Sequence, residues 1–188
     1  MASEQLDVGS QETSLVEAAT QCQNSAALAA LLASDKVTET LAVLSKARAS
    51  TLIRQLLDRF PDSAVMDELR ATEALLAWAR AENTRQFLVQ HLEVRLASLY
   101  FDQREFTKSL QLLSRLASAL KKLDDRLGLV EVHWLEARVY HALRNLAKSR
   151  ASLTAARAAS NSVYTPPGLQ ARLDYMSGLS GRGASIVR

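Results

Sequence analysis

The stretch LASLYFDQREFTKSLQLLSRLASA at positions 96–119 recurs forty positions later as EARVYHALRNLAKSRASLTAARAA at 136–159. Seven positions are identical in the two copies: Ala97 and Ala137, Tyr100 and Tyr140, Arg104 and Arg144, Lys108 and Lys148, Ser109 and Ser149, Leu113 and Leu153, and Ala119 and Ala159. Each copy has the pattern of a helix end, a short polar link and a second helix. A period near forty built from paired helices is typical of an α-solenoid. Such proteins display long surfaces on which other proteins bind.

The composition of the whole chain favours helices throughout. Its 188 residues include only three prolines and six glycines, and four of the glycines lie at or beyond position 168. The remainder is rich in Ala, Leu, Arg, Gln and Glu, which are good helix formers. A chain of this length also buries a core as one domain. We therefore predict an all-α fold.

Apolar stripes at helical spacing outline the successive helices. We expect one or two short helices in 11–33 and then helices over 37–47, 52–60, 66–81, 84–101, 106–122, 130–142 and 146–159. Pro61 ends one helix, and Thr84 is placed to cap another. The segment 123–128 reads as a link. Thr165 caps a last helix with Pro166 in its first position, and the glycines and serines after Met176 end that helix after about ten residues.

Charge and cysteine content exclude several classes of protein. The net charge of +3 is too small, and its signs too interleaved, to indicate a nucleic-acid partner. Cys22 is the only cysteine, so a disulfide framework is excluded. The N-terminus has no basic start and no apolar core, and no apolar run is long enough to span a bilayer. We expect a cytoplasmic and nuclear protein with no membrane partner.

No pattern in the sequence indicates catalysis, a metal site or a cofactor. Cys22 lies in an alanine-rich stretch and reads as a packing residue. His133, Glu136 and His141 share one predicted helix, but their spacing does not bring them together on a metal. The Asp124-Asp125 pair reads as a solvated turn. Glycine-rich phosphate loops and nucleophile motifs are absent, so we predict no enzyme activity and no small-molecule substrate.

Five aromatic side chains fall at the seams between predicted helices. These are Tyr100, Phe101, Phe106, Trp134 and Tyr140. Two of them occupy the same repeat position, which favours a packing role over base stacking or ligand binding. We therefore assign them to the helix interfaces.

Several short strings along the chain resemble one known family. They are RLASLYFD at 95–102, LKKLDD at 120–125, LVEV at 129–132, YHAL at 140–143, YTPPGLQA at 164–171 and MSG at 176–178. Their order and spacing are similar to those of the family of non-ATPase regulatory subunit 11 of the 26S proteasome, a lid subunit of the PCI family. The similarity runs from about Val37 to Gly178, is densest from Phe87, and fades before Ser34.

The resemblance implies a right-handed α-solenoid of TPR-like helix pairs, truncated here before the PCI and winged-helix region. It implies a non-catalytic scaffold that braces the lid against an ATPase subunit and the core-particle α ring in ubiquitin-dependent protein degradation. The domain organisation that follows is a poorly matching helical segment at 1–34, the solenoid at 35–178, and a disordered tail outside the family pattern at 179–188. Alternatives are a PCI subunit of the signalosome and a free-standing TPR-like adaptor that binds peptides.

Charged residues that helix packing does not explain are the candidates for contact with other proteins. They are Arg104, Lys108, Lys121, Lys122, Asp124, Asp125, Arg126, Arg144 and Lys148. The competing interpretation is that these side chains only keep the surface soluble.

Overall fold

The computed structural model describes residues 13–22, 24–61, 63–81 and 86–182. These residues form helices joined by short links, and none of them lies in a strand. The chain divides into two compact units, Met1–Leu99 and Tyr100–Arg188. The all-α prediction is confirmed.

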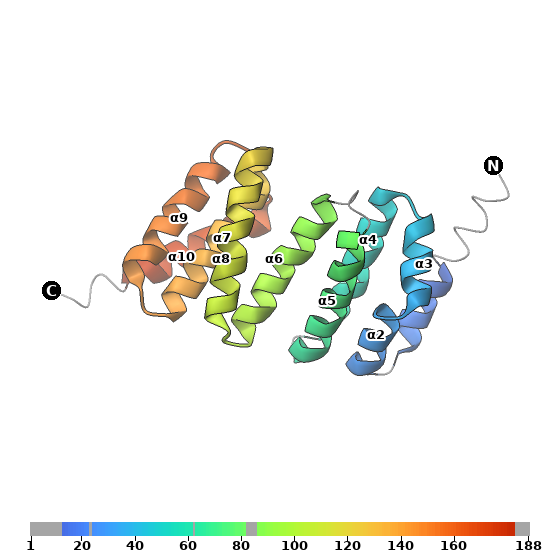
Figure 1. Ribbon diagram of the computed structural model, residues 1–188. Helices are drawn as coiled ribbons and strands as arrows, with labels where there is room; N and C mark the ends of the chain where they lie inside the picture. The colour runs from blue at the N-terminus through green and yellow to red at the C-terminus, as the bar shows by residue number, and fades with distance from the viewer. Residues whose placement is uncertain (1–12, 23, 62, 82–85, 183–188) are drawn as a thin grey trace. The chain divides into compact units, whose positions relative to one another are not determined.

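The first unit is built from short helices followed by two long ones (Figure 1). After a helical segment at 13–21 come α2 (Ser25–Leu32), α3 (Asp35–Val43), α4 (Lys46–Leu57), α5 (Val65–Ala81) and most of α6 (Gln86–Asp102). Helix α2 packs against α3 and α5, and α4 also packs against α5. The core consists of fully buried leucine and isoleucine side chains: Leu32, Leu41, Leu52, Ile53, Leu56, Leu57, Leu75 and Leu92.

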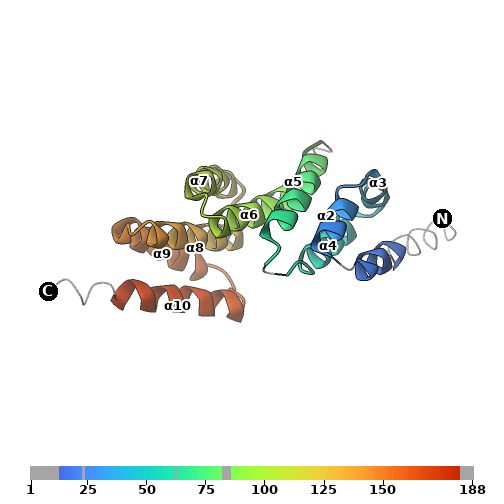
Figure 2. The same ribbon diagram turned by 90° about the horizontal axis from the view of Figure 1, so that it is seen from below.

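The second unit contains α7 (Phe106–Leu123), α8 (Arg126–Ala142), α9 (Leu146–Ser160) and α10 (Pro167–Arg182). Helix α8 packs against α7 and α9, and α10 lies across α8 and α9 (Figure 2). Leu113, Leu116 and Leu120 of α7 and Leu173 of α10 are fully buried. The unit is thus a series of helix pairs, which is the building plan of the predicted solenoid.

The repeated small residues hold the second helix pair together. Ser149 on α9 has no exposed surface, and its hydroxyl donates a hydrogen bond of 2.9 Å to the Ala137 carbonyl oxygen on α8. Ala137 is also fully buried, as are Ala97 and Ser109 at the same positions of the first copy. A side chain larger than serine or alanine would hold the two helices apart. These identities between the two copies are therefore packing requirements.

Several helix boundaries differ from the prediction. The break predicted between 47 and 52 lies earlier, because α3 ends at Val43 and α4 begins at Lys46. Helix α8 begins at Arg126, within the segment expected to be a link, because the Asp125 side chain caps it. Helix α10 begins at Pro167 and runs to Arg182, so the expectation that it ends about ten residues after Pro166 was wrong. The Pro166 carbonyl oxygen accepts the first helical hydrogen bonds, from Leu169 and Gln170.

Burial explains why α10 continues through its glycines and serines. Leu169, Leu173 and Met176 are buried at the spacing of one helix face, and Leu179 is half-buried further along the same helix. This packing outweighs the weak helix propensity of glycine and serine. Residues 179–182 are therefore helical, whereas 183–188, the rest of the expected tail, lie outside the described residues. Thr84, the expected cap of α6, also lies outside them.

Candidate protein-interaction surface

Arg104 and Arg144 occupy the sharpest point of two matching turns. Their φ angles are 63° and 60°, in the left-handed region that most side chains avoid. In the second turn, the Asn145 N–H donates to the Tyr140 carbonyl and the Arg144 N–H donates to the His141 carbonyl. This pair of hydrogen bonds is the Schellman arrangement that ends many helices. The α6–α7 turn has the same two hydrogen bonds.

Lys108 and Lys148 lie one helical turn beyond these arginines, and each covers a tyrosine. The Lys108 Nζ is 5.9 Å from the centre of the Tyr100 ring, and the Lys148 Nζ is 5.4 Å from that of Tyr140. An exposed cation over an aromatic face contributes about 0.5–1 kcal/mol. Lys108 also pairs with Glu105 at 3.6 Å. These two lysines therefore have a local structural role that the sequence did not reveal.

Three of the candidate residues, Asp124, Asp125 and Arg126, lie at the link between α7 and α8. Asp124 has a φ of 52°, and its carboxylate pairs with the Arg126 guanidinium at 2.6 Å. The Asp125 carboxylate accepts a hydrogen bond of 3.0 Å from the Gly128 N–H and so caps α8. The Asp124-Asp125 pair is therefore a turn and a helix cap, as the sequence suggested when it excluded a catalytic pair.

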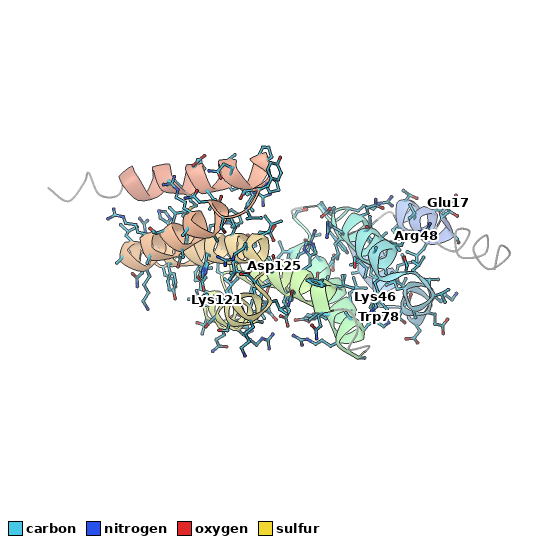
Figure 3. All side chains as sticks on the ribbon, turned by 90° about the horizontal axis from the view of Figure 1, so that it is seen from above. Glu17, Lys46, Arg48, Trp78, Lys121 and Asp125 are labelled. Atoms are coloured by element: carbon cyan, nitrogen blue, oxygen red, sulfur yellow. The ribbon has the colours of Figure 1, made fainter. Side chains whose placement is uncertain are left out.

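Lys121 and Lys122 end α7 beside this link. Both are exposed, and neither side chain makes a hydrogen bond or ion pair with another residue in the described part of the chain. Leu123 and Leu127 next to them are 49% and 36% exposed, so apolar surface adjoins the two cations. Figure 3 shows Lys121 on α7 and Asp125 where α8 begins. Of the nine candidates, these two lysines are the ones whose presence the structure of the chain itself explains least.

The nine candidate residues do not form one continuous patch. Arg104 and Lys108 lie at the start of α7, whereas Lys121 to Arg126 lie at its other end. At about 1.5 Å per residue, the thirteen positions from Lys108 to Lys121 separate the nearest members of the two groups by about 20 Å. A single partner segment that contacts both groups must run the length of α7.

Arg95 joins three parts of the first unit, and the sequence analysis missed it. Its guanidinium pairs with Asp58 and Glu68 at 2.6 Å each, and donates to the Leu57 carbonyl oxygen at 2.8 Å. Burial alone would lower the pKa of Arg95, but the hydrogen bonds to Asp58 and Glu68 outweigh burial and raise it. The partners lie 27 to 38 positions away in the chain, so no local pattern could identify them.

A cluster of arginine and aromatic side chains in the second unit was also missed. Phe101 packs against Phe106 with ring centres 5.9 Å apart, and the Arg138 guanidinium lies 4.3 Å from the Phe101 ring centre. Arg138 and Arg172 both lie over Trp134. The spacing of Trp134 and Arg138, four residues apart on one helix, was the available signal. The predicted packing role of these aromatics holds only in part, because the three rings are half-buried.

Replacement of Arg144 by glycine is expected to stabilise the chain by about 0.5–1 kcal/mol. Glycine adopts the left-handed conformation without the cost of about 1–2 kcal/mol that other residues incur, and its greater freedom in the unfolded chain offsets part of this gain. Thermal unfolding followed by circular dichroism measures the change. Ala151→Gly, in the exposed interior of α9, is the matched control and should destabilise by about 1 kcal/mol. A lower Tm for Arg144→Gly would contradict the prediction.

The residues considered for chemistry have ordinary structural partners. The Cys22 thiol is half-buried and donates to the Ala18 carbonyl oxygen at 3.3 Å. His133 Nδ1 and the Glu136 carboxylate are 2.8 Å apart. Among the described residues there is no group of three histidine, cysteine or acidic side chains that could hold a metal ion. Within the same residues, no helix has the length and apolar character needed to cross a membrane.

Comparison with known proteins gives a consistent set of relatives. Residues 3–103 match the family model of the 26S proteasome regulatory subunit RPN6 N-terminal domain. The chain is 43% identical over 141 residues to the probable 26S proteasome regulatory subunit rpn6 of Schizosaccharomyces pombe, which covers 74% of the chain and 33% of the relative. It is 43% identical over 145 residues to 26S proteasome regulatory subunit RPN6 of Saccharomyces cerevisiae, covering 76% and 33%.

A plant relative has a similar extent. The Arabidopsis thaliana homolog of 26S proteasome non-ATPase regulatory subunit 11 is 37% identical over 146 residues, covering 77% of the chain and 35% of the relative. The chain thus spans about a third of the length of these curated relatives. The family match begins at residue 3, earlier than position 37, where we expected the resemblance to begin. These relatives are proteasome subunits, so the signalosome and adaptor alternatives are not favoured.

Proposed function

The chain belongs to the family of the RPN6 N-terminal domain, and we propose that it acts as a non-catalytic scaffold segment in the lid of the proteasome regulatory particle. In this role it holds other proteins in place for ubiquitin-dependent protein degradation. The observation that carries the proposal is the family match over residues 3–103, supported by relatives named as proteasome regulatory subunits. The proposed partners are other lid subunits, an ATPase subunit and the core-particle α ring. The proposed sites of action are the cytoplasm and the nucleus.

The helix pairs suit a scaffold because their links are short and tightly bonded. Glu105, Asp125 and Asn145 each follow one helix and directly precede the next. Asp125 and Asn145 also cap the following helix through their side chains. Such links restrict movement between neighbouring helices, so the side chains on them keep a fixed spacing. A fixed spacing lets a partner bind several residues without the entropic cost of ordering them.

We also propose a domain organisation, although the family match over residues 3–103 crosses its first boundary. Residues 35–178 supply the helical-repeat scaffold, and 1–34 form an N-terminal segment that joins it. Residues 179–188 lie beyond the proposed scaffold, although α10 extends into them as far as Arg182. Within the scaffold, the nine charged residues from Arg104 to Lys148 are the proposed contacts.

Association with proteasomes is the direct test of the proposed function. The full chain, carrying an affinity tag, is expressed in cells and purified from lysate in the presence of ATP. Immunoblots for lid, ATPase and core-particle subunits should then detect all three in the bound fraction. The tag alone is the control. If proteasome subunits are at the level of this control, the scaffold proposal fails.

Charge reversal at Lys121 and Lys122 should weaken this co-purification. The two exposed cations adjoin exposed leucines, so the paired change to glutamate places repulsive charge beside an apolar contact surface. We expect the recovered proteasome to fall about tenfold, the effect of about 1.4 kcal/mol in binding. The measurement is quantitative immunoblotting of bound lid subunits.

Two controls separate contact from folding. Lys36→Glu with Lys46→Glu makes the same change of charge at two exposed residues of the first unit and should leave recovery unchanged. Glutamate at the end of α7 also opposes the helix dipole, at about 0.3–1 kcal/mol per residue. The Lys121→Gln and Lys122→Gln pair keeps most of the helix stability and should give an intermediate loss. Unchanged recovery for the folded reversal variant would show that the lysines only maintain solubility.

A further inference from the structure

The cluster formed by Phe101, Trp134, Arg138 and Arg172 brings two guanidinium groups onto one indole ring. The Arg138 Cζ is 4.8 Å from the centre of the Trp134 ring and 4.3 Å from that of Phe101. The Arg172 Cζ is 5.3 Å from the centre of the Trp134 ring. The residues come from α6, α8 and α10. We call this group the arginine–tryptophan cluster.

The nitrogen donors of the cluster have no acceptors. Within the described residues, neither the Arg138 nor the Arg172 guanidinium makes a hydrogen bond or an ion pair. The buried Trp134 Nε1 likewise has no hydrogen-bond partner among them. An unsatisfied buried donor costs about 1–3 kcal/mol. Natural proteins usually satisfy such groups, so the buried Trp134 Nε1 beneath two guanidinium groups needs an explanation.

The neighbouring acidic side chains do not neutralise the two arginines. Asp174, two residues after Arg172, instead pairs with Arg157 at 3.3 Å and accepts from Gln170. Asp102 is near enough for its charge to favour the Arg138 guanidinium. Against this, burial and the charge of Arg172 both act to lower the pKa of Arg138, and they prevail. The lowered pKa of Arg138 thus comes mainly from burial, and Asp102 offsets part of the charge of the two arginines without forming an ion pair with either guanidinium group in the described part of the chain.

We propose that the arginine–tryptophan cluster binds acidic side chains of a partner protein, with the Arg138 and Arg172 guanidinium groups as donors to the carboxylates. A guanidinium offers paired N–H donors whose spacing matches the two oxygens of a carboxylate. The stacked rings hold these donors in place before the partner arrives, which lowers the entropic cost of binding. The site is separate from the nine charged candidates and rests on the proposed scaffold role, because it specifies the chemistry of one partner contact.

Stacking alone does not account for the cluster. A cation on an aromatic ring contributes about 0.5–2 kcal/mol, but the second arginine brings another cation to the same ring, where the two repel. Arg172 is exposed, so its side chain could turn into solvent and avoid the repulsion from Arg138. It instead lies over the Trp134 ring. Arginine and tryptophan are also the residues that most often dominate protein–protein contacts. A carboxylate between the two arginines would remove the repulsion and supply the missing acceptors.

NMR titration of the full 188-residue chain tests the proposal directly. The probe is a short polyglutamate peptide with an acetylated N-terminus and an amidated C-terminus, so that its only carboxylates are in side chains. The chain has two tryptophans, and the indole N–H signal of Trp78 is an internal reference for that of Trp134. We expect the Trp134 signal to shift and saturate, while the Trp78 signal stays in place.

Three variants locate the binding. Arg172→Gln and Arg138→Gln should each weaken peptide binding about tenfold, the loss expected when one charge-assisted hydrogen bond is removed. Arg172 is exposed, so its variant should fold normally even if Arg138→Gln does not. Arg70→Gln makes the same change of charge at an exposed residue of α5 and should bind as the parent does. Unfolding curves of all variants check their stability.

All but the last of the remaining outcomes overturn the proposal. Absence of a Trp134 shift, or equal weakening by Arg70→Gln, shows that no specific site exists. An alanine peptide whose only carboxylate is its C-terminus serves as a second probe, and its stronger binding would assign the site to chain ends. A short oligothymidine is the third probe, and its stronger binding would assign the cluster to nucleic acid. Polyglutamate binding with no proteasome recovery in cells would separate this site from the scaffold role.

Discussion

Replacement of Arg95 by methionine is expected to destabilise the first unit by about 3–5 kcal/mol. The side chain of Glu68 is only 11% exposed and pairs with the Arg95 guanidinium. Removal of the arginine leaves that carboxylate buried without a cation, a change that costs about this much in other proteins. It also removes the hydrogen bond to the Leu57 carbonyl oxygen at the end of α4. Urea unfolding followed by circular dichroism gives the difference in free energy of unfolding.

Two further variants show which partner of Arg95 matters. The Asp58 side chain is 60% exposed, so Asp58→Asn should cost only about 0–1 kcal/mol. Glu68→Gln combined with Arg95→Met removes both buried charges and should recover part of the loss. If Arg95→Met costs less than Asp58→Asn, the buried pair does not stabilise the unit.

Leu173→Ala is expected to destabilise the second unit by about 2–5 kcal/mol. Leu173 has no exposed surface and lies on α10, which packs against α8 and α9. Truncation to alanine removes buried apolar surface and leaves a cavity between these helices. Thermal and urea unfolding of the full chain measure the loss.

Tyr175→Ala is the control in the same helix. Tyr175 is 67% exposed, so its truncation should change the free energy of unfolding by less than about 0.5 kcal/mol. A similar loss for the two variants would indicate that α10 contributes through its helix propensity and that its packing against the unit is weak.

The helices that follow clear apolar stripes could be predicted from the sequence. The stripe from Phe106 to Leu120 placed α7 closely, and Pro61 marked the break between α4 and α5. The end of α10 could not be predicted, because glycine and serine disfavour helix locally. Leu173 and Met176 override that preference only through contact with other helices. The start of α8 was missed although its cause is local. Asp125 caps the helix through its own side chain, but it lies in a run of polar residues that resembles a link.

The contact role of the nine charged residues stays a prediction, whereas their exposure can be compared with the structure. Exposed charge could be read from the sequence, and Lys121 and Lys122 are exposed as expected. The stacking of Lys108 and Lys148 on tyrosines depends on the turn geometry set by Arg104 and Arg144. The partners of Arg95, and the approach of Phe101 and Arg172 to Trp134 and Arg138, depend on residues far apart in the chain. Without a fold, no spacing rule brings such residues together.

The short links between the helices have a mechanical consequence. Within the second unit, the links from α7 to α8 and from α8 to α9 contain only two or three residues, so a load applied to one of these helices is transmitted to the next with little deformation. The link from Ser160 to Pro167 is longer, and it is held by a hydrogen bond between the hydroxyl groups of Ser160 and Thr165. Under a bending force, the second unit should therefore yield first between α9 and α10 while its earlier helix pairs stay stiff.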